Sequence, residues 1–446
     1  MKKLLIAAAA LALAAGLVAT ALGVYLVRKL SPAELEKAIL EQARATLGTE
    51  LRVQRMDVSL LSGVTLEGIA VRNPAPFPGD LLTADAFVLR YRLLPLLAGR
   101  VEVERLALEK PALTALMDAR GGFNYEKLGG GTAAKAAPGA PAAAVPLRIV
   151  MKSLAVEGGS VVLKDAAKAL LLSASDIGFR SAFEVTGGGA QGEGGVSVGS
   201  VSLADVLFVR GAKGSLSISK AALSLTPIRG QVAGGALTGG VLVALEPFHY
   251  TADLAVDGAK VKTLLAEAKS AAAFSGNLSG KARFEGRGGL PTIRGTGSAD
   301  VSSCRAEGSR VLALLAGVLQ VPELANPDFE ACHVEFQQTG SRFATPVVSL
   351  KGDALRLTGG GTLDLDTSGL DYRMTLALSP RLFAKITRPE LRGAFETRDA
   401  GFAAIDFRLY GTTLEPKTDL LSRLGKAAAT ETAKQGVNKL LKKKIF

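Results

Sequence analysis

The strongest constraint on this chain is an alternation of apolar and polar residues that recurs in separate runs from about Leu51 onward. Between residues 363 and 378, apolar side chains alternate with Asp, Arg and Thr on either side of a turn at 367–369. Successive side chains of a strand point to opposite faces, so a period of two predicts a β-hairpin with one apolar face. The same alternation recurs at 216–218, 223–225, 248–256 and 405–409.

Breaks that contain Gly or Pro separate these runs about every 8–15 residues, a spacing typical of antiparallel meanders. We therefore expect a mainly β fold, an elongated antiparallel sheet with few helices. Hydrophobic residues make up 48% of the chain, so such a sheet has apolar surface to cover. Two sheets packed as a sandwich would cover each other's apolar faces. A single sheet would instead leave its apolar face as a groove for a ligand.

The N-terminus begins with an unbroken apolar run, Leu4–Val27, between Lys2-Lys3 and Arg28-Lys29. A bilayer core needs about 20 apolar helical residues, whereas a cleaved signal peptide has an apolar stretch of about 7–15. Ala19-Thr20-Ala21, which resembles a cleavage site, lies inside the run. We therefore expect an uncleaved transmembrane signal-anchor with the rest of the chain exported, although the flanking charges alone leave its orientation open.

Three helices are expected in the remainder of the chain. Ser31 and Pro32 are typical of a helix start, and the helix they begin is expected to end near Gly48. A second, apolar helix is expected at 310–321, where Pro322 stops it. The third covers 419–446, and its terminal lysines fit either an interfacial helix or a helix C-terminus that favours positive charge.

These patterns divide the chain into five parts. We expect an anchor at 1–30, a helix with a β unit at 31–128, an Ala/Gly/Pro linker at 129–146, a β-rich body at 147–418 and a basic amphipathic helix at 419–446.

The net charge of +12 has several explanations. A basic surface can meet nucleic acid or anionic lipid head groups. Nucleic-acid binding usually combines clustered cations with stacking aromatics, but here Lys and Arg are scattered and aromatics are 5% of residues. We expect no nucleic-acid partner and interpret most of the charge as solvated surface.

No pattern of catalytic or metal-binding residues is apparent in the sequence. His249 and His333 stand far apart without neighbouring ligands, and no P-loop, nucleophile elbow or dinucleotide fingerprint occurs. We expect that the protein is not an enzyme and that it binds no metal and no cofactor. Cys304 and Cys332 flank the predicted helix at 310–321, whose two ends would bring them together. They form either a disulfide or two unpaired small apolar residues.

The order of motifs resembles the AsmA family of bacterial envelope proteins. The resemblance rests on Leu94–Val101 (LPLLAGRV), Lys110-Pro111, Asp118–Gly121 and Phe123-Asn124-Tyr125, preceded by IAVRNPAPFPGD at 69–80. The apolar helix near 311–321, the hairpin at 359–378 and the end at 407–417 (FRLYGTTLEPK) are similar to the family's C-terminal region. The chain has Phe and Tyr where the family often has Trp beside the Asn, and it is short for the family.

The resemblance implies a single-pass anchor in the cell inner membrane and a body in the periplasm. It also implies a role in outer-membrane biogenesis or lipid homeostasis, with phospholipid handled or conducted along an apolar β-groove. The alternative is a structural or assembly factor for outer-membrane proteins that acts through protein partners. The residues we predict to line such a groove, each of which also fits an ordinary core, are Val101, Val103, Leu363, Leu365, Tyr372, Met374, Leu376, Leu378, Phe407 and Leu409.

Overall fold

The structure is a computed structural model, and it confirms that the chain is mainly β. It describes residues 37, 40, 41, 44, 47–59, 63–92, 95, 100–128, 148–186, 189–270, 274–287, 292–307, 310–398, 401–413 and 415–426. The predicted anchor, the linker at 129–146 and most of the predicted C-terminal helix lie outside these residues. Within the described part of the chain, no helix is long and apolar enough to cross a bilayer.

The chain divides into two compact units, which are described separately. Unit 1 comprises residues 1–231 and 238–250, and unit 2 comprises 232–237 and 251–446. The division falls inside the β-rich body expected at 147–418.

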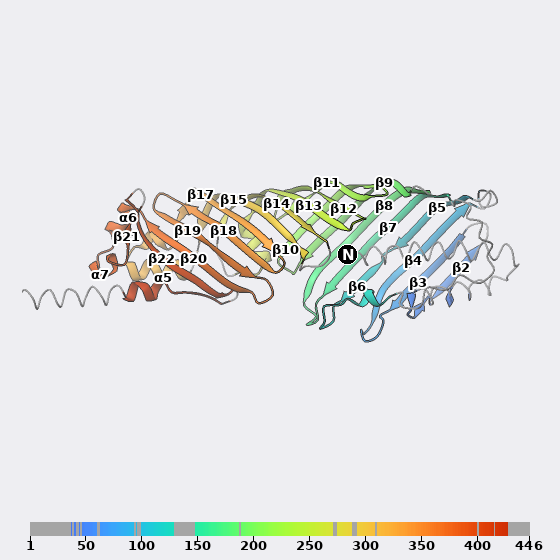
Figure 1. Ribbon diagram of the computed structural model, residues 1–446, viewed down its shortest axis with the longest axis horizontal. Coiled ribbons are helices and arrows are strands. Elements are labelled where there is room, and N and C mark those ends of the chain that lie inside the picture. The colour runs from blue at the N-terminus through green and yellow to red at the C-terminus, as the bar shows by residue number, and fades with distance from the viewer. Residues whose placement is uncertain are drawn as a thin grey trace, which may run out of the picture. The chain divides into compact units, whose positions relative to one another are not determined.

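The described part of unit 1 consists almost entirely of strands (Figure 1). Its elements are β1 (Leu51–Arg52), β2 (Arg55–Ser59), β3 (Gly63–Arg72), β4 (Asp80–Arg92), β5 (Arg100–Glu109), β6 (Ala112–Leu116), η1 (Asn124–Lys127), β7 (Arg148–Lys164), β8 (Leu170–Thr186), β9 (Gly189–Leu203), β10 (Leu207–Ile218), β11 (Ala222–Val232, whose last residue belongs to unit 2) and β12 (Gly235–Ala244, which both units share).

The pairing in unit 1 is antiparallel for β2–β3–β4–β5 and for β7–β8–β9–β10. β7, however, runs parallel to both β5 and β6, which differs from the all-antiparallel sheet that we expected. Parallel neighbours need a long crossover connection, and residues 117–147 provide it. β5 and β6 lie along one line beside β7, interrupted at Lys110-Pro111, where Lys110 has φ +43°.

Unit 2 is a meander with a small helical part. Its elements are β13 (His249–Lys260, whose first two residues belong to unit 1), α4 (Val261–Glu267), β14 (Phe274–Gly286), β15 (Arg294–Ala306), α5 (Arg310–Leu319), η3 (Pro322–Leu324), β16 (Asp328–Phe329), β17 (Ala331–Thr339), β18 (Arg342–Lys351), β19 (Leu355–Asp364), β20 (Gly369–Leu378), α6 (Pro380–Ala384), α7 (Pro389–Arg392), β21 (Glu396–Thr397), β22 (Ala403–Thr412) and β23 (Pro416–Thr418).

Antiparallel pairing runs through β14–β15–β17–β18–β19–β20–β22. This confirms the hairpin predicted at 363–378, whose turn joins β19 to β20. The apolar helix predicted at 310–321 is also confirmed as α5, which ends three residues before Pro322.

Three helices of unit 2, α5, α6 and α7, lie together beside β20, β21 and β22 (Figure 1). Local sequence explains the short α6: Ser379 caps it by accepting a hydrogen bond from the Leu382 amide (3.3 Å), and Pro380 occupies its first turn. We call α5, α6, α7 and the helical residues 420–426 the helical cap.

Candidate functional site

One face of the unit 2 sheet carries large apolar side chains from β20 and β22. Tyr372, Met374 and Leu376 of β20 point to this face, opposite Leu409, Phe407 and Ile405 of β22, respectively. The exposed fraction changes along β20: it is 0% at Leu378, 2% at Leu376 and 7% at Met374, and Tyr372 is only half-buried. Residues that have the same place in the alternation are therefore covered at one end of the strand and accessible at the other.

The helical cap causes this difference. Leu376 and Leu378 share a hydrophobic core with Leu315 of α5, Leu382 of α6 and Leu391 of α7. Tyr372, Leu409 and Leu363 do not belong to that core. Beyond the helical cap, the described part of unit 2 has an accessible apolar surface, which we call the apolar strip. It consists of Phe284, Phe336, Phe343, Leu363, Tyr372 and Leu409, all half-buried.

The aromatic rings of the apolar strip form a ladder over glycines. Phe336 stacks on Phe343 with ring centroids 4.9 Å apart, and on Phe284 at 6.3 Å. A Cβ on Gly295 would lie 2.5 Å from the Phe284 ring, and one on Gly297 would lie 2.5 Å from the Phe336 ring. Because glycine has no side chain, both rings can pack directly against the backbone of the neighbouring strand. Three aromatic rings, from β14, β17 and β18, therefore lie together on this face.

The opposite face of the same strands is polar and paired. Arg408 of β22 donates to Asp371 of β20 at 2.8 Å, and Arg283 of β14 lies 3.4 Å from Asp253 of β13. The hydrogen bond from Arg408 lowers the pKa of Asp371 below its ordinary value. The two faces of the sheet thus differ in chemistry.

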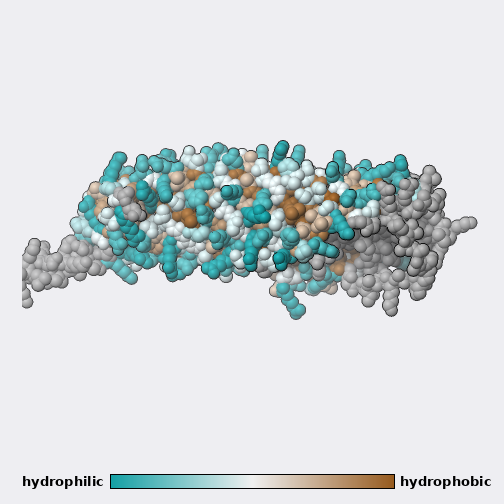
Figure 2. Space-filling model, turned by 45° about the horizontal axis from the view of Figure 1, so that its top comes forward, coloured by the Kyte–Doolittle hydropathy of each residue, from teal (hydrophilic) through white to brown (hydrophobic). Residues whose placement is uncertain are grey.

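Figure 2 shows one side of the molecule, on which hydrophobic residues reach the surface between hydrophilic ones.

The residues that we predicted to line a groove fall into four groups. Val103 is buried in the core of unit 1, and Met374, Leu376 and Leu378 are buried in unit 2. Leu365, 43% exposed, lies in the turn after β19. Leu363, Tyr372 and Leu409 lie in the apolar strip, and half-buried Phe407 packs against the capped core. Val101 pairs with Ile149 in β5 and β7, but its side chain lies outside the described part.

Sequence reasoning missed the aromatic ladder. Phe336 stands between Glu335 and Gln337, and Phe284 between Arg283 and Glu285. This alternation predicts that each ring lies on the apolar face of its strand. The pairing with a glycine on the next strand is visible only in the register.

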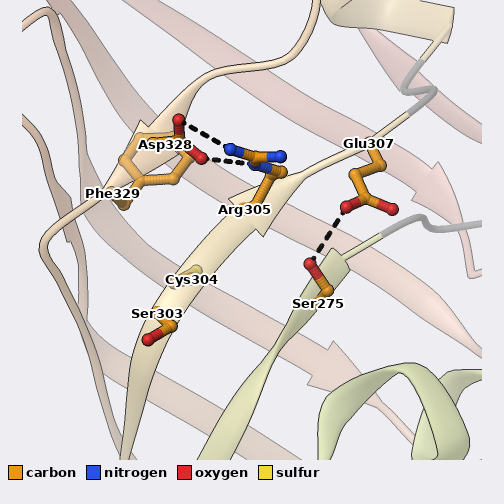
Figure 3. Close-up of a pocket in the computed structure, with 7 residues that line it drawn as sticks. All are labelled: Ser275, Ser303, Cys304, Arg305, Glu307, Asp328 and Phe329. Atoms are coloured by element: carbon orange, nitrogen blue, oxygen red, sulfur yellow. Dashed lines mark hydrogen bonds and ion pairs between the residues drawn. The ribbon is translucent and has the colours of Figure 1, made fainter.

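A concavity of about 390 Å³ lies beside Cys304 (Figure 3). Cys304 of β15 and Cys332 of β17 form a disulfide, which closes the chain around α5 and η3. The charged groups nearby already have partners, because Arg305 forms a two-point ion pair with Asp328, and Ser275 donates to Glu307 at 3.3 Å. The Arg305 guanidinium lowers the pKa of Asp328. We interpret this cluster as structural.

The histidines do not form a site together. His333 lies 2.7 Å from Asp300 and 3.4 Å from Glu335 on the polar face of unit 2, and its pKa is raised, mainly by the hydrogen bond with Asp300. His249 contacts the Pro247 carbonyl oxygen at 3.2 Å. Among the described residues, no group of three or more His, Cys, Asp or Glu side chains is placed to hold a metal ion.

Comparison with known proteins adds one finding. Residues 1–182 match the model of the AsmA family. The N-terminal part of this chain is therefore similar to the AsmA family. The match confirms the resemblance of that region, whereas the resemblance of the C-terminal region stays a prediction. No curated protein and no solved structure matches this chain.

The Phe123-Asn124-Tyr125 signature lies inside the AsmA segment, and its role there is visible. Asn124 is fully buried, and its side-chain amide donates to the Asn73 side-chain oxygen (2.7 Å) and to the Thr114 carbonyl (2.8 Å). Its oxygen accepts from the amides of Leu116 (3.0 Å) and Tyr125 (2.9 Å). All of its polar atoms are therefore satisfied, which is how a buried amide becomes favourable.

Asn73 in turn donates to the Pro78 carbonyl oxygen at 2.6 Å, within the IAVRNPAPFPGD stretch at 69–80. Phe123 and Tyr125 stack with ring centroids 5.2 Å apart, and Tyr125 packs in a small core with Leu81 and Ala115. The two family motifs thus meet in one place. Their role in the AsmA segment is to hold its loops to β6.

Proposed function

We propose that this AsmA-family protein is an envelope protein that holds phospholipid acyl chains on the apolar strip of unit 2. The proposal includes an inner-membrane anchor at the N-terminal apolar run, with both units in the periplasm. It contains no catalytic step. The observation that carries it is the apolar strip, a set of half-buried apolar and aromatic side chains outside the helical cap, opposite a face of paired charges.

The energetics favour an apolar occupant. Burying each methylene of an acyl chain stabilises a complex by about 0.8 kcal/mol. The stacked rings of Phe284, Phe336 and Phe343 offer contact along several strands, so many methylenes of one chain can be covered. The helical cap limits the strip at the Leu378 end, so that bound lipid would lie toward Tyr372 and Leu409.

The test compares the lipid content of three full-length proteins purified in the same mild detergent. Tyr372 and Leu409 face each other on the apolar strip, so the variant Tyr372→Asp/Leu409→Asp places two charges on it. The control, Leu365→Asp/Tyr410→Asp, makes the same chemical change at apolar residues that are already exposed.

We expect the wild type and the control to retain phospholipid after extraction and mass spectrometry, and the strip variant to lose most of it at an unchanged melting temperature. Lipid-free wild-type protein, or equal lipid in all three proteins, would contradict the proposal. A lipid-free result would favour the alternative of an assembly factor that acts through protein partners.

A further inference from the structure

Unit 1 has a basic concavity that the lipid proposal does not use. It has a volume of about 700 Å³ and lies on β10 and β11. Arg210, Lys213 and Arg229 supply its charged side chains, and Ser215 and Gln231 supply neutral hydrogen-bonding groups. The lining residues include no carboxylate. The lining of the concavity therefore offers hydrogen-bond donors and positive charge, and it contains no carboxylate that could neutralise that charge.

The two strands lie in close contact at this concavity. A Cβ on Gly230 would lie 3.4 Å from the Arg210 carbonyl oxygen, and one on Gly214 would lie 2.9 Å from a Leu225 methyl carbon. Gly211 has φ +58°, a conformation that glycine adopts at little cost, and nothing would lie within 4 Å of its Cβ. Lys213 and Arg229 alternate with Gly214 and Gly230 along their strands, and both cationic side chains are exposed.

Several strand cations of this protein have carboxylate partners across the sheet. Examples are Arg55 with Glu67 (3.2 Å), Arg92 with Glu104 (2.6 Å) and Arg408 with Asp371 (2.8 Å). Lys213 and Arg229 form no ion pair within the part of the chain that the structure describes. Two cations in one concavity repel each other, and a bound anion removes that repulsion.

We propose that this concavity is a binding site for a phosphate ester, held by Lys213 and Arg229 with Ser215 and Gln231 as neutral partners. Guanidinium and ammonium groups form charge-assisted hydrogen bonds with phosphate oxygens, which are stronger than neutral ones. Arg210, whose guanidinium lies 5.7 Å from the centre of the Phe208 ring, adds positive charge at the edge of the site. A lipid head group and a soluble phosphate ester present the same chemistry.

The experiment measures binding of two probes to the full-length protein in a non-ionic detergent. One probe is glycerol 3-phosphate in solution, and the other is phosphatidylglycerol mixed into the micelles. The site variant is Lys213→Gln/Arg229→Gln. The control is Lys281→Gln/Arg342→Gln, which removes the same charges from exposed positions in β14 and β18 of unit 2.

We expect the site variant to bind at least one probe about tenfold more weakly than the wild type, a difference of about 1.4 kcal/mol, and the control to bind as the wild type does. Loss for phosphatidylglycerol alone identifies a head group as the source, and loss for both probes identifies the phosphate ester itself. No binding by the wild type, or equal weakening in site variant and control, would overturn the proposal. These outcomes concern unit 1 and leave the lipid test of unit 2 unaffected.

Discussion

The side-chain amide of Asn124 donates a hydrogen bond to the Asn73 side-chain oxygen at 2.7 Å, across 51 residues of chain. Removing the Asn124 side chain leaves its buried hydrogen-bonding partners unsatisfied, at a cost of about 1–3 kcal/mol for each group. We therefore expect Asn124→Ala to speed hydrogen exchange of the Leu116 and Tyr125 amides, which both donate to Asn124, by about 100-fold or more.

A suitable control is Asn277→Ala, because Asn277 accepts from Lys260 at an exposed position. Exchange at Leu116 should stay as in the wild type in that protein. Slow exchange at Leu116 in Asn124→Ala would contradict the structural role assigned to the signature.

The capped and uncapped ends of the apolar face should respond differently to truncation. Leu376 is 2% exposed in the core beneath the helical cap, so Leu376→Ala leaves a cavity and should destabilise unit 2 by about 2–5 kcal/mol. Leu365 is 43% exposed, and Leu365→Ala should change stability by about 0.5 kcal/mol or less. Thermal unfolding of both variants checks this, and similar melting temperatures would show that the cap does not bury Leu376.

The disulfide between Cys304 and Cys332 encloses α5 and η3, with a sequence separation of 28 residues. Removing a cross-link of this kind increases the freedom of the unfolded chain and typically costs about 2–4 kcal/mol. We expect a reducing agent to lower the melting temperature of the wild type. The variant Cys304→Ser/Cys332→Ser should melt at that lower temperature and be insensitive to the reductant. A wild type that melts at the same temperature with and without reductant would contradict this.

Stability at acid pH should depend on Asp406. Arg398 donates to both of its oxygens (2.9 and 2.8 Å) and Thr375 donates at 2.7 Å, so these hydrogen bonds lower its pKa in the folded state. A carboxyl whose folded pKa is lowered stabilises the fold above its unfolded pKa of about 3.9. This contribution disappears as the pH falls through the folded value.

Asp406→Asn should accordingly lower the melting temperature at pH 7, and the difference from the wild type should shrink steadily below about pH 4. Melting curves between pH 7 and pH 2.5 test this. A difference that stays constant over that range would exclude the ionised carboxylate as its cause.

The alternation in the sequence predicted strands and hairpins well, because a period of two is a local property. Tyr372, Met374, Leu376 and Leu378 occupy equivalent places in that alternation, yet the helical cap buries the last two and leaves Tyr372 accessible. Short helices such as α6 and α7, with five and four residues, carry too little periodicity to be predicted. Which end of the apolar face they cover is a tertiary property.

The parallel pairing of β7 with β5 and β6 was missed for a similar reason. The alternation in these strands is the same for parallel and antiparallel neighbours, and only the long connection at 117–147 distinguishes them. The Asn73–Asn124 contact was likewise hidden, although both residues lie in segments that carry the family resemblance.

The most direct test of the lipid proposal compares two neighbouring residues of β22. Leu409 lies in the apolar strip and Tyr410 points to the opposite face. Each is replaced in turn by the photoreactive residue p-benzoylphenylalanine in the full-length protein, and intact cells are irradiated before the protein is purified and its mass measured. The account predicts a phospholipid adduct at position 409 and none at position 410. Equal adducts at both positions, or none at 409, would contradict it.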